Sequence, residues 1–337
     1  MKAVVLVGGE GTRLRPLTET IPKPLIPLVD RPFLAHVLDH LAEHRIDEAL
    51  LSSPYLEKVF APFLEARRGG PAARWIAEAS PLGTGGAIAN AARELEDTFL
   101  VLNGDILTDL DLTALADHHR TTGAVATITL VPVEDARPYG LVTLSDDGMV
   151  LAFREKPEHL VPGLVNAGTY VLEPEAVRDV PVGRPVSVER EIFPALIASG
   201  AHLSGFVSTA YWMDVGTPEK YLRATFDALE GRVEDLGYEA PFVDPSAEVS
   251  LRAQLGRWVV IGPGAVVEHG AEVEDSVVLA SGRVASGARV RDSIVGPGAT
   301  VGRGAIVQGA VLGERASVPE GVVSEGARVS PGQTLTT

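Results

Sequence analysis

The chain has 337 residues, 45% of them hydrophobic, and its 45 Asp and Glu outnumber its 29 Lys and Arg, giving a formal charge of −16. That size and hydrophobic content allow two domains with buried cores. The negative charge repels nucleic acids and anionic membranes, and no segment approaches the ~20 apolar residues that span a bilayer, so neither is an expected partner. The N-terminus lacks the basic-then-apolar layout of a signal peptide, which favours a cytoplasmic protein.

In residues 1–232, short apolar runs alternate with helical patterns. The runs fall at 2–8, 48–53, 73–79 and 98–105, and the helical patterns at 33–44, 56–68, 85–96 and 112–123. This alternation is typical of βαβ units and predicts a Rossmann-like α/β domain with a mostly parallel sheet. Ligands of such sheets bind beyond the carboxyl ends of the strands, so the polar residues after each run are candidates for a site.

From residue 242 onwards the pattern becomes a short repeat. Aliphatic residues recur every six residues, or five at slips, at Ile261, Val267, Val273, Leu279, Val284, Val290, Val295, Val301, Val307, Leu312, Val318, Val323, Val329 and Leu335. The third residue after most of them is glycine, including Gly264, Gly282 and Gly298. One inward aliphatic and one corner glycine per six residues describe a flat-sided coil. The pattern resembles the hexapeptide repeat of left-handed parallel β-helices, and we expect such a domain over residues 242–337.

The stretch LVGGEGTRLRPLTETIPKPLIPL (6–28) extends from the end of the first apolar run. It lacks the Gly-Lys-Ser/Thr ending of a P-loop, and Leu14 stands where a dinucleotide-binding motif has its third glycine. Glycines after a strand let the backbone approach phosphate oxygens, and Arg13 and Lys23 supply positive charge. The prolines are expected to stiffen the loop and to hold Lys23 in extended backbone. The candidate nucleotide contacts are Leu6, Gly8, Gly9, Gly11, Thr12, Arg13 and Lys23.

Two shorter signals concern local structure. Thr217 directly precedes Pro218, which predicts a helix that is capped by the threonine and begins at the proline. The pair His118 and His119 falls at a polar helical end and is expected at the surface rather than in a metal site.

Six further motifs follow the N-terminal stretch in order. They are PLGTGGAI (81–88), NGD (103–105), YG (139–140), REKP (154–157), NAGTYVL (166–172) and WMDVGTPEKYL (212–222). Together with GGEGTRLRPLT and PKPL they resemble the signature of the sugar-phosphate nucleotidyltransferases. Within that family the arrangement is most similar to the mannose-1-phosphate guanylyltransferases.

The resemblance implies that a sugar 1-phosphate attacks the α-phosphorus of a nucleoside triphosphate and releases pyrophosphate. It implies that Asp105 and Asp214 hold Mg²⁺, a small hard cation suited to carboxylates and phosphate oxygens. It assigns Arg13 to the leaving pyrophosphate, Lys23 to the α-phosphate and Lys156 to the sugar phosphate. The other contacts it implies are Pro81, Gly83, Thr84 and Asp105 for the nucleotide, and Gly140, Glu155, Asn166 and Asp214 for the sugar phosphate.

Glu78 bears on the choice of base. In the family a side chain just before the PLGT motif reads the base, and here Glu78 occupies that position. Guanine presents two adjacent donors to an acceptor-only carboxylate, whereas uracil flanks its single N–H with acceptors that a carboxylate repels. Glu78 therefore favours GTP, and the resemblance favours mannose 1-phosphate as the second substrate.

Two alternatives remain open at this stage. The first is a uridylyl-, thymidylyl- or adenylyltransferase acting on glucose 1-phosphate, against which only Glu78 and overall similarity stand. The second is a non-catalytic regulatory subunit. The joint retention of the charged site residues argues against it; these are Arg13, Lys23, Asp105, Lys156 and Asp214. A homo-oligomer is expected, and the β-helix is expected to serve either its assembly or the support of the catalytic domain.

Overall fold

The computed structural model describes residues 1–54, 57–234 and 236–336. Leu56 and Thr337, the first residue of the predicted helix over 56–68 and the last of the predicted C-terminal domain, lie outside the described residues. The chain divides into two compact units, which are described separately. The first unit contains residues 1–9 and 34–212, and the second contains residues 10–33 and 213–337.

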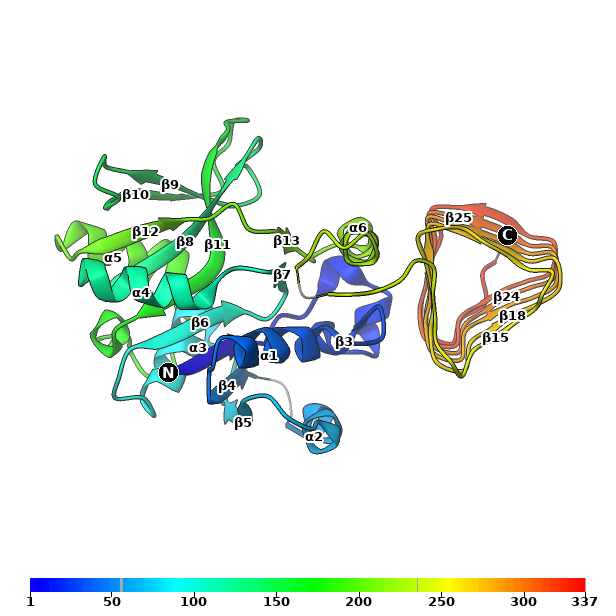
Figure 1. Cartoon of the computed structure of the whole chain (residues 1–337), viewed down its shortest axis with the longest axis horizontal. Coiled ribbons are helices and arrows are strands. Elements are labelled where there is room, and N and C mark those ends of the chain that lie inside the picture. The colour runs from blue at the N-terminus through cyan, green and yellow to red at the C-terminus, as the bar shows by residue number, and fades with distance from the viewer. Residues whose placement is uncertain (55–56, 235, 337) are drawn as a thin grey trace. The chain divides into compact units, whose positions relative to one another are not determined.

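The first unit is built on a nine-stranded sheet (Figure 1). Four strands run parallel in the order β6 (Phe99–Asn103), β1 (Lys2–Leu6), β4 (Glu48–Ser53) and β5 (Ala72–Ala77). Next to β6 lies antiparallel β11 (Gly163–Leu172), which also pairs with β8 (Ala126–Val133) and β9 (Gly140–Leu144). The sheet ends in β10 (Val150–Glu155) on β9 and in β12 (Leu203–Val207), which runs parallel to β8. The predicted Rossmann-like sheet is confirmed. Each antiparallel pair in it contains at least one strand that begins at or after residue 126.

Helices cover both faces of this sheet. The helices are α1 (Phe33–Glu43), α2 (Glu57–Ala66), α3 (Gly83–Ala92), α4 (Leu112–Thr122) and α5 (Phe193–Ala198), with the short η4 (Pro174–Val177) and the π-helix η5 (Val188–Ile192). Ile88 of α3 and Phe193 of α5 pack in one buried cluster with Tyr170 of β11. Alternate residues of a strand face opposite sides of the sheet. Helix α4 packs on the side opposite this cluster, where its His119 contacts Thr127 of β8. No helix among the described residues is both long and apolar enough to cross a bilayer.

The second unit begins with three 3₁₀ turns and a hairpin. These elements are η1 (Thr12–Leu14), η2 (Leu17–Glu19), η3 (Lys23–Leu25), β2 (Pro27–Leu28) and β3 (Arg31–Pro32). The helix α6 (Pro218–Leu229) begins as predicted, with the Thr217 hydroxyl accepting from the Lys220 N–H at 3.3 Å. The Tyr221 hydroxyl donates to the Pro27 carbonyl at 2.7 Å and ties α6 to the hairpin. Two short strands remain: β7 (Ile106–Thr108) in the first unit and β13 (Trp212–Asp214), which spans the division.

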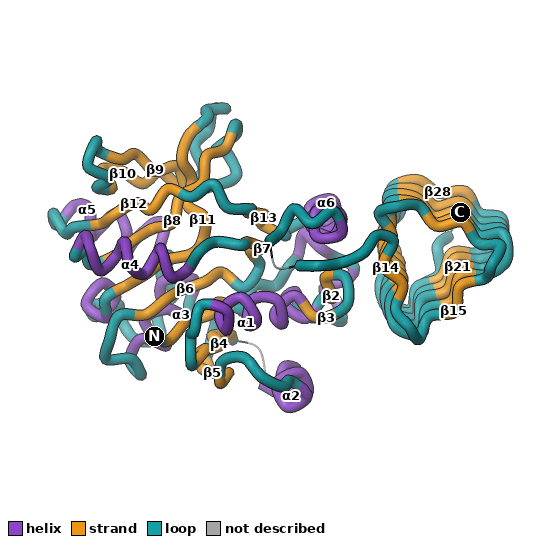
Figure 2. Tube along the Cα trace, in the orientation of Figure 1, coloured by secondary structure: helices purple, strands orange, loops and turns teal. Residues whose placement is uncertain are grey.

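The rest of the second unit is a three-sided coil of parallel strands, consistent with the predicted left-handed β-helix (Figure 2). The first side is formed by β14 (Phe242–Val243), β17 (Val259–Ile261), β20 (Ser276–Val278), β23 (Ile294–Val295), β26 (Val311–Leu312) and β29 (Arg328–Val329). The second is formed by β15 (Glu248–Val249), β18 (Val266–Val267), β21 (Arg283–Val284), β24 (Thr300–Val301) and β27 (Ser317–Val318). The third is formed by β16 (Gln254–Leu255), β19 (Glu272–Glu274), β22 (Arg289–Arg291), β25 (Ile306–Gln308) and β28 (Val323–Glu325).

The register of the coil corrects two predicted inward positions. Ile261 pairs with Val278, not with the predicted Leu279, and Val307 pairs with Ser324, not with the predicted Val323. Val323 is 73% exposed. The physical reason is that the five-residue steps run from Val273 to Val278 and from Ser324 to Val329, each between the third and the first side. The sequence pattern allowed the first of these steps one position later and the second one position earlier.

One predicted corner glycine is also wrong. Gly282 does not have a positive φ; the neighbouring Ser281 does, at 57°. Ser281 holds the same corner as Gly264 and Gly298, whose φ angles are 61° and 63°. The corner therefore requires a left-handed backbone, which glycine adopts most easily but which serine also adopts here.

Candidate active site

The chain leaves β1 and β6 side by side at the carboxyl edge of the sheet. Leu6 and Asn103 are partners in register, and the Gly104 N–H donates to the Leu6 carbonyl at 2.9 Å. A Cβ at Gly104 would lie only 2.8 Å from that carbonyl oxygen, so the NGD motif requires glycine at its centre. Half-buried Asp105 follows directly. The strand-end position expected of a ligand-binding carboxylate is thus present.

The NAGTY motif packs against the NGD motif. Gly168 has φ of 75°, and a Cβ there would lie 2.6 Å from the Asn103 amide nitrogen. The Asn166 side chain accepts from the Gly168 N–H at 2.9 Å and donates to the Tyr170 hydroxyl at 2.8 Å. Burial strongly raises the pKa of Tyr170, so that hydroxyl stays protonated. These two bonds use one donor and one lone pair of Asn166, which leaves the amide one of each for a further hydrogen-bond partner.

Gly140 and Glu155, which were both predicted to contact the sugar, lie opposite each other in the sheet. They pair across β9 and β10, and a Cβ at Gly140 would lie 3.0 Å from a Glu155 carboxylate oxygen. Burial raises the pKa of Glu155, and the charge of Glu189 raises it further. Lys156 lies 3.9 Å from the Glu155 carboxylate and is 58% exposed, so this ion pair is loose and leaves the ammonium accessible.

Glu78 is held at both carboxylate oxygens. It follows β5, where the Ser52 hydroxyl donates to one oxygen at 2.9 Å and the Leu82 N–H donates to the other at 3.1 Å. Each carboxylate oxygen has a second lone pair, so these bonds orient the group without exhausting it.

A segment that the sequence reasoning missed covers the PLGTGG motif. The Val186 carbonyl accepts from the N–H groups of Gly85 and Gly86 at 2.8 and 3.1 Å. A Cβ at Gly83, whose φ is 66°, would lie 2.7 Å from the same oxygen. The hydroxyl of Thr84 donates to Glu189 at 2.8 Å. The only sequence signal was the polar cluster SVERE (187–191), which follows a Pro- and Gly-rich loop.

In the second unit the N-terminal loop folds back on itself. Gly11 has φ of 60°, its carbonyl accepts from the Thr18 hydroxyl at 2.8 Å, and a Cβ there would lie 3.2 Å from Lys23 Cβ. Lys23 opens the 3₁₀ turn η3, so the expectation of extended backbone at this residue is wrong. The preference of a residue before proline for extended backbone is overcome here by the hydrogen bonds of the turn, since the N–H groups of Leu25 and Ile26 donate to the Pro22 and Lys23 carbonyls at 2.8 and 3.2 Å.

The same unit gathers cations around Asp214. The Lys220 ammonium lies 3.2 Å from the Asp214 carboxylate. A Cβ built at Gly216 would lie 3.2 Å from the other Asp214 oxygen and 2.7 Å from a terminal nitrogen of Arg13. Two predicted site residues, Arg13 and Asp214, therefore both lie close to Gly216, and Lys220 lies beside Asp214. Lys220 was not predicted, although the capping signal at Thr217 placed it in the first turn of α6.

Gly216→Ala is expected to displace the Arg13 guanidinium. The added methyl group would meet the flexible end of a side chain, so the fold should lose no more than about 1 kcal/mol while turnover falls by about tenfold. Thermal unfolding and pyrophosphate release measure the two effects. Gly237→Ala is the matched control, because nothing lies within 4 Å of a Cβ at that position. Wild-type turnover in Gly216→Ala would remove Arg13 from the reaction.

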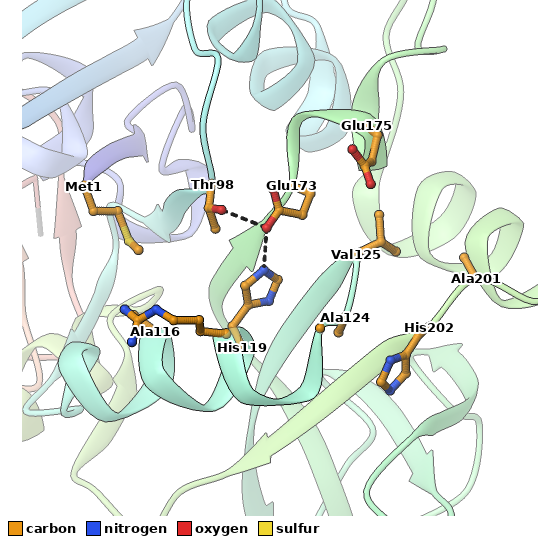
Figure 3. Close-up of a pocket in the computed structure, with 12 residues that line it drawn as sticks. Met1, Thr98, Ala116, His119, Ala124, Val125, Glu173, Glu175, Ala201 and His202 are labelled. Atoms are coloured by element: carbon orange, nitrogen blue, oxygen red, sulfur yellow. Dashed lines mark hydrogen bonds and ion pairs between the residues drawn. The ribbon is translucent and has the colours of Figure 1, made fainter.

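A pocket of about 510 Å³ lies in the first unit among residues that the predicted site does not include (Figure 3). His119 is only 3% exposed there, so the prediction that it is a surface residue is wrong. Burial lowers the pKa of His119, and its ring contacts Thr127 through Nδ1 at 2.8 Å and Glu173 through Nε2 at 3.2 Å. A neutral ring that accepts from the threonine and donates to the carboxylate satisfies both contacts. His119 was misjudged because its polar sequence neighbours hid this partnered position.

Comparisons with known proteins agree with this arrangement. The family described as "Nucleotidyl transferase" matches residues 2–231, and "GMPPB C-terminal domain" matches residues 238–337. The chain is 42% identical to "Mannose-1-phosphate guanylyltransferase" of Mycobacterium tuberculosis, over 84% of this chain and 82% of the relative. It is 36% identical to "Mannose-1-phosphate guanyltransferase" of Debaryomyces hansenii, over 84% of this chain and 83% of that protein.

A solved structure shares the fold of about two thirds of the chain. The crystal structure of HddC from Yersinia pseudotuberculosis complexed with GMP-PN is 31% identical, covers 66% of this chain and 97% of that chain, and has a TM-score of 0.59. The motifs, the sheet and these relatives lead to one conclusion: the chain belongs to the nucleotidyl transferase family.

Proposed function

We propose that this enzyme transfers a guanylyl group from GTP to mannose 1-phosphate, forming GDP-mannose and pyrophosphate, and that it requires Mg²⁺. The observation that carries the proposal is the 42% identity, over 84% of the chain, to a relative named mannose-1-phosphate guanylyltransferase. The two donors that fix the Glu78 carboxylate support the choice of base, because they leave an acceptor-only group before the PLGT motif.

Asp105 and Asp214 are the proposed ligands of Mg²⁺. No group of three or more His, Cys, Asp or Glu side chains suited to a metal occurs in the described parts of the chain. Mg²⁺ nevertheless fits, because it commonly takes one or two carboxylates and completes its shell with phosphate oxygens and water. When bound, it would neutralise phosphate charge.

The remaining roles follow from charge and position. The reaction joins two anions, so Arg13, Lys23 and Lys156 are proposed to bind the pyrophosphate, the α-phosphate and the sugar phosphate. Glu155, Asn166 and the Gly140 backbone are proposed to bind sugar hydroxyls. A phosphate monoester dianion is itself the nucleophile, so the chain needs no general base. The glycines after β1 would bring backbone N–H groups close to the triphosphate.

The test is pyrophosphate release with GTP, UTP, dTTP, ATP and CTP, each paired with mannose 1-phosphate and with glucose 1-phosphate. The proposal expects the highest kcat/KM for GTP with mannose 1-phosphate and no turnover after chelation of Mg²⁺. A maximum at another pair would keep the chemistry and overturn the specificity. No turnover with any pair would favour a non-catalytic subunit.

The proposal extends to the organisation of the chain. We place the catalytic domain at residues 1–232 and the β-helix domain, with its hexapeptide repeat, at residues 242–337. We also propose a homo-oligomer formed through the β-helix, in the cytoplasm, where nucleoside triphosphates are supplied.

A further inference from the structure

The π-helix η5 presents a carboxylate to the PLGTGG motif. Glu189 accepts from the Thr84 hydroxyl at 2.8 Å and from the Ser187 hydroxyl at 2.6 Å. The Thr84 oxygen in turn accepts from the Val188 N–H at 3.0 Å. Short π-helical segments are uncommon and often occur at functional sites. This closed set of bonds fixes the first turn of α3, where the proposed nucleotide contacts Gly83 and Thr84 lie.

The close packing at this point leaves little freedom for another arrangement. A Cβ at Gly85 would lie 2.6 Å from an Ile192 methyl carbon and 3.0 Å from the Val188 nitrogen. The Val186 N–H also donates to the Leu82 carbonyl at 2.8 Å. The segment that carries Glu189 is therefore fitted to the PLGTGG motif by backbone contacts, and the Thr84 bond adds a side-chain contact to the same junction.

Glu189 also acts on the proposed sugar site. Glu155 lies in β10, against which η5 packs, and the charged groups that act on it are Glu189, Lys156 and Arg190. Glu189 opposes the ionisation of Glu155, whereas Lys156 and Arg190 favour it. One carboxylate thus has a hydrogen bond to the nucleotide motif and an electrostatic effect on a sugar-binding group.

We infer that Glu189 is a positioning residue: it orders the nucleotide-binding turn through Thr84 and, from η5, which packs on β10, it acts on Glu155 of the proposed sugar site. The inference rests on the proposed function for the identity of these two sites. It assigns Glu189 no contact with a reacting atom. Because a carboxylate accepts best from sugar hydroxyls when ionised, loss of the Glu189 charge should extend the activity of the enzyme to lower pH.

Glu189→Gln separates the charge from the hydrogen bond. The amide oxygen can still accept from Thr84, so kcat/KM at neutral pH should fall less than about threefold. The acid limb of the pH profile of kcat/KM for the sugar phosphate should move to lower pH, because the pKa of Glu155 falls when its negative neighbour is removed. A purely structural role would leave this limb in place.

Glu189→Ala removes the hydrogen bond as well. The Thr84 hydroxyl then loses its acceptor, and the dissociation constant of GTP, measured by calorimetry, should rise by about tenfold. This binding measurement does not depend on turnover. It therefore still tests the nucleotide half of the inference if the enzyme acts on another sugar or is inactive.

Glu191 provides the matched control. It lies in the same π-helix, but its carboxylate accepts from Arg184 at 2.9 Å and from the Ser187 N–H at 3.1 Å, whereas the Thr84 hydroxyl donates to Glu189. Glu191→Gln and Glu191→Ala should keep the wild-type acid limb and nucleotide affinity. The pH profiles are measured with the nucleotide and sugar phosphate that the wild type uses best. An error in the proposed substrates would therefore appear in the choice of that pair and not in the comparison of the variants. Equal behaviour of the Glu189 and Glu191 variants would overturn the inference.

Discussion

Replacement of Asp105 or Asp214 by alanine is expected to lower kcat by at least about two orders of magnitude in an enzyme that remains folded. Each carboxylate is a proposed ligand of the metal that neutralises the phosphates, and the loss of one such electrostatic contact commonly costs this much. Both side chains are partly exposed, Asp214 by 17%, so their removal leaves no large cavity. The main effect should therefore be on turnover rather than on stability.

Pyrophosphate release over a range of Mg²⁺ concentrations is the measurement. A variant that has lost one ligand should need more Mg²⁺ for half-maximal activity, a shift that a folding defect would not produce. Asp117→Ala is the control, because Asp117 is a 60% exposed carboxylate on α4 that pairs with Arg120. Full activity in either site variant would remove that residue from the metal site.

Asp214 allows a finer comparison than Asp105. Alanine at this position leaves Lys220 and Arg13 without the carboxylate that lies near both. Asp214→Asn keeps the shape but not the charge. If ligation is the main role, both variants should lose turnover to a similar degree. If the carboxylate mainly orients Lys220, the asparagine variant should retain most of its activity.

The parts of the fold that the sequence predicted are those set by local patterns. The apolar runs of the parallel strands and the Thr217–Pro218 helix start both depend on near neighbours in the chain. Local patterns also predicted the three-sided coil, since each turn repeats the one before it.

Contacts between distant residues were not predictable in the same way. Thr84 and Glu189 are 105 residues apart, and no spacing rule connects them. Lys220 was missed because its partner Asp214 lies before the helix, so the pair has no helical spacing. In the coil, the repeat was correct but its five-residue step was misplaced, because Leu279 and Val323 are as aliphatic as a core position requires. Only pairing between turns decides which residue points inward.

Glu78→Gln is expected to reduce the preference for GTP over UTP by roughly one to two orders of magnitude. The glutamine can keep the bond from Ser52 through its amide oxygen. Its NH₂ group would then face the Leu82 N–H, where two donors oppose each other, and would present a donor in place of an acceptor to guanine. Both effects act against GTP, whereas a uracil carbonyl could accept from the new NH₂ group.

The measurement is kcat/KM for GTP and for UTP with the same sugar phosphate, so that the ratio cancels any general loss of active protein. Ser52→Ala is the control, because it removes one donor to Glu78 and leaves the carboxylate charge and the Leu82 bond in place. That variant should use GTP less well, by less than about tenfold, without a change in the ranking of the nucleotides. If Glu78→Gln instead keeps the wild-type ratio, the base is read by another group, and Glu78 serves only to join β4 and β5 to the turn before α3. The contrast between these two variants therefore separates recognition of the base from support of the loop.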